Sequence, residues 1–191
     1  LTPNYSTYYE KGEPENSFSI RVPYYINLAP DRDLLIALTY MSSRGFIYEG
    51  KYRQLIAPKI SEDHEDSMYS IEAKYLPEDK ITGLKRWLVN FSEELDLSDK
   101  THLSARYHRV SDKNYFEEIA KTNTNLTTLK SSLEYSYEDI EKNHSFSILT
   151  EDEQGVNGNK PGYMRALEVS ANKSFSLGQE KLNELNNTRQ K

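Results

Sequence analysis

The feature that most constrains this chain is a long run of alternating side chains that begins at Ser17. The apolar positions of this run are Phe18, Ile20, Val22, Tyr24, Ile26 and Leu28. Because successive side chains of a strand point to opposite sides, the run predicts a strand with one apolar and one largely polar face. It is long enough for the ~9–11 residues with which a tilted strand crosses the hydrocarbon core of a bilayer. The same pattern also suits a strand over a soluble sandwich core, so periodicity alone leaves both structures open.

Further alternating segments follow at near-regular spacing. They are residues 34–42, 46–56, 68–76, 87–91, 103–107, 129–137, 145–149 and, less cleanly, 163–175. Residues 3–16 predict a lead-in with a first partial strand, residues 95–101 a turn, and residues 114–120 a short helix in a connection. Short strands without helices between most of them indicate an antiparallel meander. The fold class predicted is all-β, an up-and-down meander of about nine or ten strands in one region, residues 1–191.

Composition removes several classes of protein. The mean hydropathy is −0.81, and no apolar run approaches the ~20 residues of a transmembrane helix, so a helical membrane protein is excluded. A membrane barrel is compatible with this value, because half of each strand faces a polar lumen, and the 15 tyrosines suit the aromatic girdles of barrels. A net charge of −6 without a basic stripe argues against nucleic acid as a partner. The chain contains no cysteine, so it has neither a disulfide framework nor a thiolate metal site.

No catalytic or metal-binding motif is recognisable. The four histidines lie outside any Gly-x-Ser-x-Gly or His-Glu-x-x-His pattern, and no glycine-rich phosphate loop is present, so we expect neither an enzyme nor a cofactor. The acidic segment from Glu62 to Asp66 is expected to be a solvated loop, with cation-bridged contact to anionic lipid as the alternative. No metal site is predicted.

Several short motifs occur in a characteristic order. They are Val22-Pro23-Tyr24-Tyr25-Ile26-Asn27-Leu28-Ala29-Pro30-Asp31, Tyr40-Met41-Ser42-Ser43-Arg44-Gly45, Tyr52-Arg53, Tyr75-Leu76-Pro77-Glu78-Asp79-Lys80, Arg86-Trp87 and Arg109-Val110-Ser111-Asp112-Lys113-Asn114-Tyr115-Phe116. Their order and spacing resemble the start of the β-barrel in the LptD (OstA) family of lipopolysaccharide-assembly proteins. The resemblance runs through most of the chain and is densest before Phe116.

The resemblance implies a fold, a location and a set of partners. The chain would be the N-terminal portion of a barrel of about 26 strands, with the periplasmic domain and the remaining strands absent from it. It would serve a non-enzymatic translocon that inserts lipopolysaccharide into the outer leaflet of the Gram-negative outer membrane. The implied partners are lipopolysaccharide, outer-membrane lipid, a lipoprotein plug (LptE-like), periplasmic lipopolysaccharide-bridge proteins and the barrel-assembly machinery.

Three groups of residues are candidates for functional roles. Proline lacks a backbone N–H and weakens a strand ladder, and the resemblance places Pro23, and less closely Pro3, at a lateral gate between the first and last strands. The lumen-lining candidates are Arg21, Tyr25, Asn27, Glu49, Lys51 and Arg53. The lipid-facing candidates are Phe18, Ile20, Val22, Tyr24 and Ile26. A passive outer-membrane pore, a barrel hydrolase and a soluble β-sandwich binding module remain as alternative functions.

Overall fold

The sheet comprises ten strands in a computed structural model that describes residues 3–8, 17–56, 67–121, 125–162 and 164–174. The strands are β1 (Asn4–Tyr8), β2 (Ser17–Ala29), β3 (Arg32–Met41), β4 (Gly45–Ile56), β5 (Ser67–Leu76), β6 (Arg86–Ser98), β7 (Thr101–Val110), β8 (Thr128–Asp139), β9 (His144–Gly155) and β10 (Arg165–Lys173). A one-turn π-helix, η1 (Phe116–Ala120), lies between β7 and β8.

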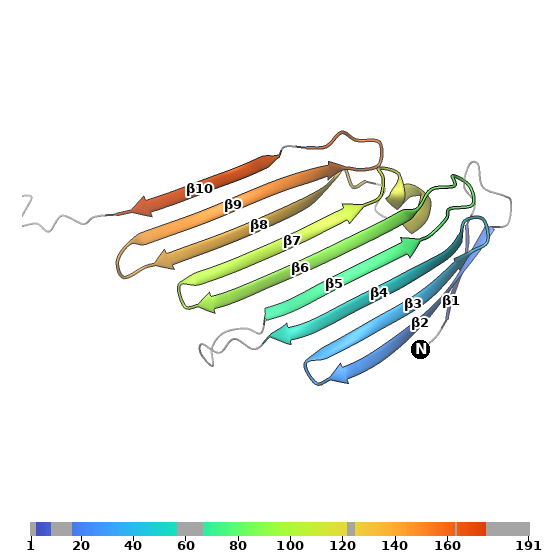
Figure 1. Cartoon of the computed structure of the whole chain (residues 1–191), viewed down its shortest axis with the longest axis horizontal. Helices are drawn as coiled ribbons and strands as arrows, with labels where there is room; N and C mark the ends of the chain where they lie inside the picture. Colours follow the sequence, from blue (N-terminus) through green and yellow to red (C-terminus); the bar gives the residue numbers. More distant parts are fainter. Residues whose placement is uncertain (1–2, 9–16, 57–66, 122–124, 163, 175–191) are drawn as a thin grey trace, which may run out of the picture.

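Each strand pairs antiparallel with the next one along the chain, so the spatial order is the sequence order from β1 to β10. Figure 1 shows the resulting single, curved sheet with η1 at one end. The predicted all-β meander is confirmed, and its strand count falls within the predicted range. Among the described residues, no helix has the length and apolar character needed to cross a membrane.

One predicted turn is shorter than expected. Residues 95–101 were expected to turn the chain, whereas β6 continues to Ser98 and the turn occupies residues 99–100. The strand continues because its acidic residues meet basic partners on β7: Glu94 pairs with Arg106, and Asp96 lies 2.8 Å from the ring of His102. Opposite charges across a strand pair stabilise the ladder, so these acidic residues extend the strand instead of ending it.

The sheet has an apolar face and a polar face. On the apolar face, β2 residues stand opposite β3 residues as Ile20 with Tyr40, Val22 with Leu38 and Tyr24 with Ile36. The apolar face continues across the following strands through Tyr48, Ile71, Phe91, Leu103, Leu133, Ile148 and Val169. The polar face carries the alternate residues, such as Arg21 and Asn27.

The two ends of the sheet differ in their connections. The turns at residues 30–31, 99–100 and 140–143 lie at one end, which we call the turn end. The connections at residues 42–44, 77–85, 111–127 and 156–164 lie at the other, which we call the loop end. Figure 1 shows η1 at the loop end, beside the ends of β6 and β7. We call residues 111–127, of which 122–124 are outside the description, the insertion.

The buried apolar core lies at the loop end of the polar face. The insertion supplies Tyr115, Phe116 and Ile119, which pack on residues of the sheet and of its connections. These are Met41, Ile47, Leu76, Leu88, Leu129, Val110 and Val156. Elsewhere the large side chains stay accessible, with Val22 exposed by 51% and Tyr24 by 58%. The described strands form one sheet with no second sheet over it, so they do not form a β-sandwich.

Candidate functional site

The polar face of β2 to β5 carries a connected set of charged side chains. Arg21 on β2 donates from Nε to both carboxylate oxygens of Glu49 on β4, at 3.1 and 3.0 Å. The hydroxyl of Thr39, on the intervening strand β3, donates to the same carboxylate. Lys74 on β5 lies 3.8 Å from Glu49 and 3.2 Å from Glu72. One carboxylate therefore links four consecutive strands, and its charge is balanced by two cations.

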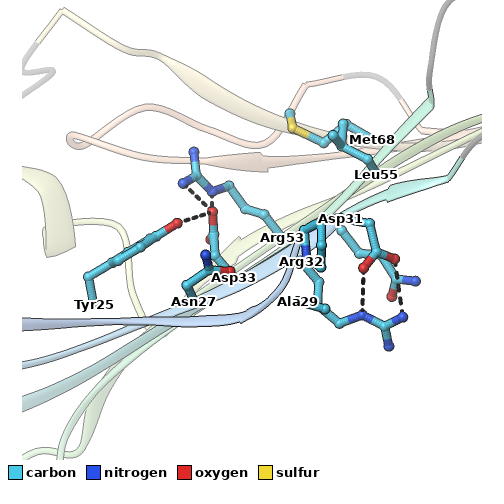
Figure 2. A pocket seen from close by; sticks show the side chains of 11 residues that line it. Tyr25, Asn27, Ala29, Asp31, Arg32, Asp33, Arg53, Leu55 and Met68 are labelled. Atoms are coloured by element: carbon cyan, nitrogen blue, oxygen red, sulfur yellow. Dashed lines mark hydrogen bonds and ion pairs between the residues drawn. The ribbon is translucent and has the colours of Figure 1, made fainter.

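A second polar group lies nearer the turn end, where side chains of β2, β3 and β4 converge (Figure 2). The Tyr25 hydroxyl donates to Asp33 at 3.1 Å, and Arg53 donates to both oxygens of Asp33 at 3.0 and 2.7 Å. In the adjoining turn, Arg32 donates to Asp31, and these hydrogen bonds hold the pKa of the Asp31 carboxyl below its usual value. These residues line a hollow of about 260 Å³.

The six lumen-lining candidates all lie on the polar face. The structure joins Arg21 directly to Glu49, and it joins Tyr25 to Arg53 through Asp33. The other two, Asn27 and Lys51, stand opposite Asp33 and Glu72 in the strand register. Whether any of the six lines a lumen stays a prediction.

Sequence analysis did not single out several members of these groups. Asp33 lies just before the predicted strand 34–42, but it is the second residue of β3 and the centre of the group with Tyr25 and Arg53. Thr39 and Lys74 were not singled out either, although each falls on the polar side of its strand's alternation. The alternation was the signal that could have found them.

The lipid-facing candidates lie together on the apolar face. Ile20, Val22 and Tyr24 are exposed, and Phe18 and Ile26 are partly covered by neighbouring strands. At the loop end of this face, successive ring contacts join Tyr5, Phe18, Tyr40 and Phe46, with centroids 4.9–6.1 Å apart. Nearer the turn end, a second set joins Tyr52, Tyr69 and Phe91 at 6.0 and 5.4 Å. The apolar face therefore has an aromatic row towards each end, although lipid contact itself remains a prediction.

The backbone nitrogen of Pro23 faces β1. Phe18 exchanges hydrogen bonds with Ser42, next to β3: its carbonyl accepts from the Ser42 N–H and its own N–H donates to the Ser42 hydroxyl, both at 3.0 Å. The backbone groups of a strand alternate between its two neighbours, and the β2–β3 register is unbroken from Ser19 to Asn27. The backbone N–H and C=O groups of Phe18 and Val22 therefore point to β3, and the backbone nitrogen of Pro23 points to β1. Its missing N–H removes nothing from the β2–β3 ladder.

The described part of the β1–β2 ladder involves the β2 residues that precede Pro23. It runs from the pair Tyr8 and Ser17 to the pair Asn4 and Arg21, two residues before the proline. Pro3 is exposed and directly precedes β1. Because Asn4 pairs with Arg21, Pro3 is placed at the level of Val22, and the two prolines occur at the same end of this ladder. A gate at this place is a prediction to which we return below.

A buried cluster of charges was missed by sequence analysis. Asp79, on the β5–β6 connection, accepts from Arg44 of the β3–β4 turn at 2.7 Å and from Arg86 at 3.2 Å. Arg86 also donates to Asp112 and Glu118 of the insertion, both at 2.9 Å. Asp79, Arg86 and Arg44 have side chains exposed by 0%, 2% and 4%. Arg44, Asp79, Arg86 and Asp112 fall within the motifs named above, but no local signal indicated that they meet, because they come from three separate connections and the start of β6. We call these five residues the ionic cluster.

A hollow separates the insertion from the first strands on the polar face. It encloses about 500 Å³, with Tyr115, Ile119 and Lys121 on the insertion side and Ser6, Arg21 and other residues of β1 to β6 on the sheet side. Burial lowers the pKa of the Lys121 amine to about 8 and raises the pKa of the Tyr115 hydroxyl. The hollow is thus amphipathic, with charged groups over an apolar floor that includes Met41 and Leu88.

Neither the acidic segment nor a metal site supports a functional assignment. The acidic segment from Glu62 to Asp66 lies outside the described residues. Within the described ranges, no group of three or more histidine or acidic side chains is arranged to hold a metal ion.

Comparison with known proteins identifies one family. A family model described as "LptD: LPS transport system D" matches residues 85–178. The LPS-assembly protein LptD of Shewanella sp. (strain MR-4) is 28% identical over 177 residues, which cover 90% of this chain and 21% of the relative. LptD of Cupriavidus necator is 26% identical over 159 residues, 81% of this chain and 18% of the relative. LptD of Cupriavidus pinatubonensis is 31% identical over 108 residues, 56% of this chain and 12% of the relative.

These matches extend along most of the chain and lead to one family. The chain spans about a fifth or less of the length of the curated relatives that it matches. The ten-stranded open meander is consistent with part of a barrel wall. The chain belongs to the LptD family of LPS-assembly proteins.

Proposed function

We propose that this chain forms part of the barrel wall of a translocon that delivers lipopolysaccharide to the outer leaflet of the outer membrane. Proteins of the LptD family reside in the outer membrane of Gram-negative bacteria. The observation that carries the proposal is the sidedness of the sheet: one face carries apolar side chains on every strand from β2 to β10, and the other bears the charged groups around Glu49 and Asp33. A membrane barrel needs an outward apolar band and a polar interior.

The aromatic rows support a membrane-spanning position. Phe46 and Tyr52 lie six positions apart on β4, which corresponds to about 20 Å along a strand. This is close to the ~25 Å apolar band that aromatic girdles flank in outer-membrane barrels. In such barrels the short turns face the periplasm and the longer loops face outward. We therefore assign the loop end, with the insertion, to the cell surface.

The two prolines support a lateral gate at the first strands. Pro23 lacks a donor on its β1 side, and within the described residues the β1–β2 ladder runs from the pair Tyr8–Ser17 to the pair Asn4–Arg21. A strand pair with fewer hydrogen bonds separates at a lower free-energy cost. These prolines would loosen the first strands, and lipopolysaccharide would pass from the polar interior through the seam between the first and last strands of the barrel into the outer leaflet. The lipoprotein plug, the periplasmic bridge and the assembly machinery implied by the family would be partners of the whole protein.

Transport requires no bond-making chemistry from this chain. Its charged side chains would screen and guide the phosphates and sugars of lipopolysaccharide past the polar face, while the energy would come from other components of the pathway. The charges around Glu49 are paired with one another, which avoids a strong single-sign field that would hold an anionic lipid in place.

The proposal is tested with the full-length protein in cells from which it can be depleted. Newly made lipopolysaccharide is pulse-labelled, and the fraction that reaches the cell surface is followed over time. We expect depletion to stop delivery and re-expression to restore it. Unchanged delivery during depletion, together with ion conductance by the purified protein, would instead identify a passive pore.

A further inference from the structure

We infer that the apolar face holds a binding site for one lipid with a phosphorylated sugar headgroup, at the loop end of β7 to β9. The inference rests on the proposed function, because it needs this face to contact the membrane. It goes beyond that function, because the site lies on the outside of the wall, whereas lipopolysaccharide in transit would follow the polar face. Three observations carry it: an interrupted strand ladder, a hollow beside it, and an ion pair on the apolar face.

Side chains replace the ladder between β7 and β8 at the loop end. The last pair of this ladder is Arg106 and Ser132, although both strands continue further towards the loop end. Beyond it, the side-chain amide of Gln154 on β9 bonds both backbone groups of Val110, at 3.0 and 2.8 Å. The Ser131 hydroxyl accepts from another backbone N–H of β7 at 3.1 Å. These backbone groups therefore keep the partners that a lipid environment requires, but β7 and β8 are no longer paired directly.

A hollow of about 340 Å³ lies on the apolar face at this place. The strand register puts most of its lining on that face, where Phe91 stands opposite Tyr107 and Ala105 stands opposite Leu133. Ala105 is small and leaves room between the larger side chains around it. Apolar side chains that surround a hollow favour the burial of hydrocarbon, so this hollow suits part of a lipid acyl chain.

An ion pair lies at the loop-end edge of the hollow, where Arg109 of β7 donates to Asp152 of β9. Both residues are on the apolar face, because Arg109 stands opposite Val89 and Asp152 opposite Ser131. Charged side chains on the lipid-facing side of a barrel are unfavourable in the membrane interior and are tolerated near its interfaces. Arg109 is the second-to-last residue of β7, which places the pair at the level of lipid headgroups. A charged pair at such a position indicates a functional site.

The chemistry of this pair fits a phosphorylated sugar. A guanidinium has several N–H donors in a planar fork, and among the described residues Arg109 bonds only Asp152, so its other donors can bind a phosphate. The Asp152 side chain, which is 44% exposed, can accept from a sugar hydroxyl. The ring of Tyr107, exposed by 46%, lies beside them with its apolar body towards the hollow. Because the loop end is assigned to the cell surface, the lipid that meets the pair is the glycolipid of the outer leaflet.

The inference is tested with the full-length protein, purified in detergent and titrated with diphosphorylated lipid A. Native mass spectrometry counts the lipid molecules retained and gives their dissociation constants. Arg109→Gln removes the phosphate donor, and Arg109→Gln/Asp152→Asn does so without leaving an unpaired carboxylate. Ala105→Phe fills the hollow and keeps the ion pair. The matched control is Arg32→Gln, which breaks the pair of Arg32 and Asp31 at the turn end.

We expect the parent to hold one lipid A molecule more tightly than any other. Its dissociation constant should rise by about tenfold or more in both Arg109 variants and in Ala105→Phe, since each loses a charge-assisted hydrogen bond or the place of an acyl chain. Arg32→Gln should bind as the parent does. Unchanged binding in the double variant would overturn the inference, because the ion pair would then serve only to join β7 and β9. Equal affinity of the parent for phosphatidylglycerol would overturn it too, because the sugar would then contribute nothing.

Thermal unfolding supplies a second readout that does not depend on transport. Because a ligand that binds the folded state stabilises it, lipid A should raise the unfolding midpoint of the parent more than that of Ala105→Phe. An equal rise in both proteins would contradict the inference. If depletion left lipopolysaccharide delivery unchanged while the purified protein still bound lipid A through Arg109, the proposed function would fail and the lipid site would stand. If delivery depended on the protein but no substitution weakened lipid A binding, the function would stand and the site would fail.

Discussion

The guanidinium of Arg44 on the β3–β4 turn donates a 2.7 Å hydrogen bond to Asp79 on the β5–β6 connection, with both side chains buried. Asp79 also accepts from Arg86, so one carboxylate compensates two buried cations. This relationship fixes how three connections of the loop end sit together, and it makes Asp79 the most sensitive member of the cluster.

We expect Asp79→Asn to lower the free energy of unfolding by about 3–5 kcal/mol, because the isosteric change removes the buried carboxylate charge that two buried guanidinium groups share. Urea titration of the full-length protein in detergent micelles measures the change. The control is Asp99→Asn in the exposed β6–β7 turn, which should stay within ~0.5 kcal/mol of the parent. Equal effects at both positions would show that the ionic cluster does not stabilise the fold.

The docking of the insertion on the sheet depends on Phe116, which is buried in the apolar core. Phe116→Ala should destabilise the docked insertion by about 3–5 kcal/mol, through lost burial and the cavity left behind. Limited proteolysis should then cut within residues 111–127 faster than in the parent. Glu117→Ala, one residue further along the same turn and exposed, should leave the cleavage rate unchanged.

Restoring the missing donor at position 23 should strengthen the β1–β2 seam. Pro23→Ala supplies an N–H on the β1 side, and one added hydrogen bond is worth about 0.5–1.5 kcal/mol. We expect slower hydrogen exchange in β1 and lipopolysaccharide delivery slowed by up to about tenfold. Pro30→Ala, in the exposed β2–β3 turn, is the control and should alter neither quantity. Faster delivery by Pro23→Ala would argue against a gate at this place.

The Lys121 amine should titrate near neutrality. Burial lowers its pKa from the ordinary 10.5 to about 8. Between pH 8 and pH 10.5 the Lys121 amine holds more protons in the unfolded chain than in the folded chain. The free energy of docking of the insertion should therefore become more favourable as the pH rises through this range. Reductive methylation with ¹³C-formaldehyde followed by NMR should show a lysine signal with a midpoint near pH 8 that is absent in Lys121→Gln. A signal assigned to Lys121 that keeps the ordinary midpoint would mean that the amine is solvated.

Alternation along single strands determined much of this structure before any contact was known. The run from Phe18 to Leu28 predicts one strand with an apolar side, and β2 has that side exposed at Val22 and Tyr24. Side-chain direction in a strand follows from position alone, so the faces and the strand order could be predicted. The continuation of β6 to Ser98 could not be predicted, because the cross-strand partners of Glu94 and Asp96 are residues of the following strand.

Only the tertiary structure decided which charges meet. Arg21 and Glu49 are separated by 28 positions, and Arg44 and Asp79 by 35. Whether such residues come together depends on the register of several ladders at once, and a shift of one residue would turn each side chain to the other face. The docking of the insertion and the hollow beneath β1 depend on the same registers. Local sequence therefore specified each strand of this sheet, whereas the ionic cluster and the docked insertion arise from pairings between strands.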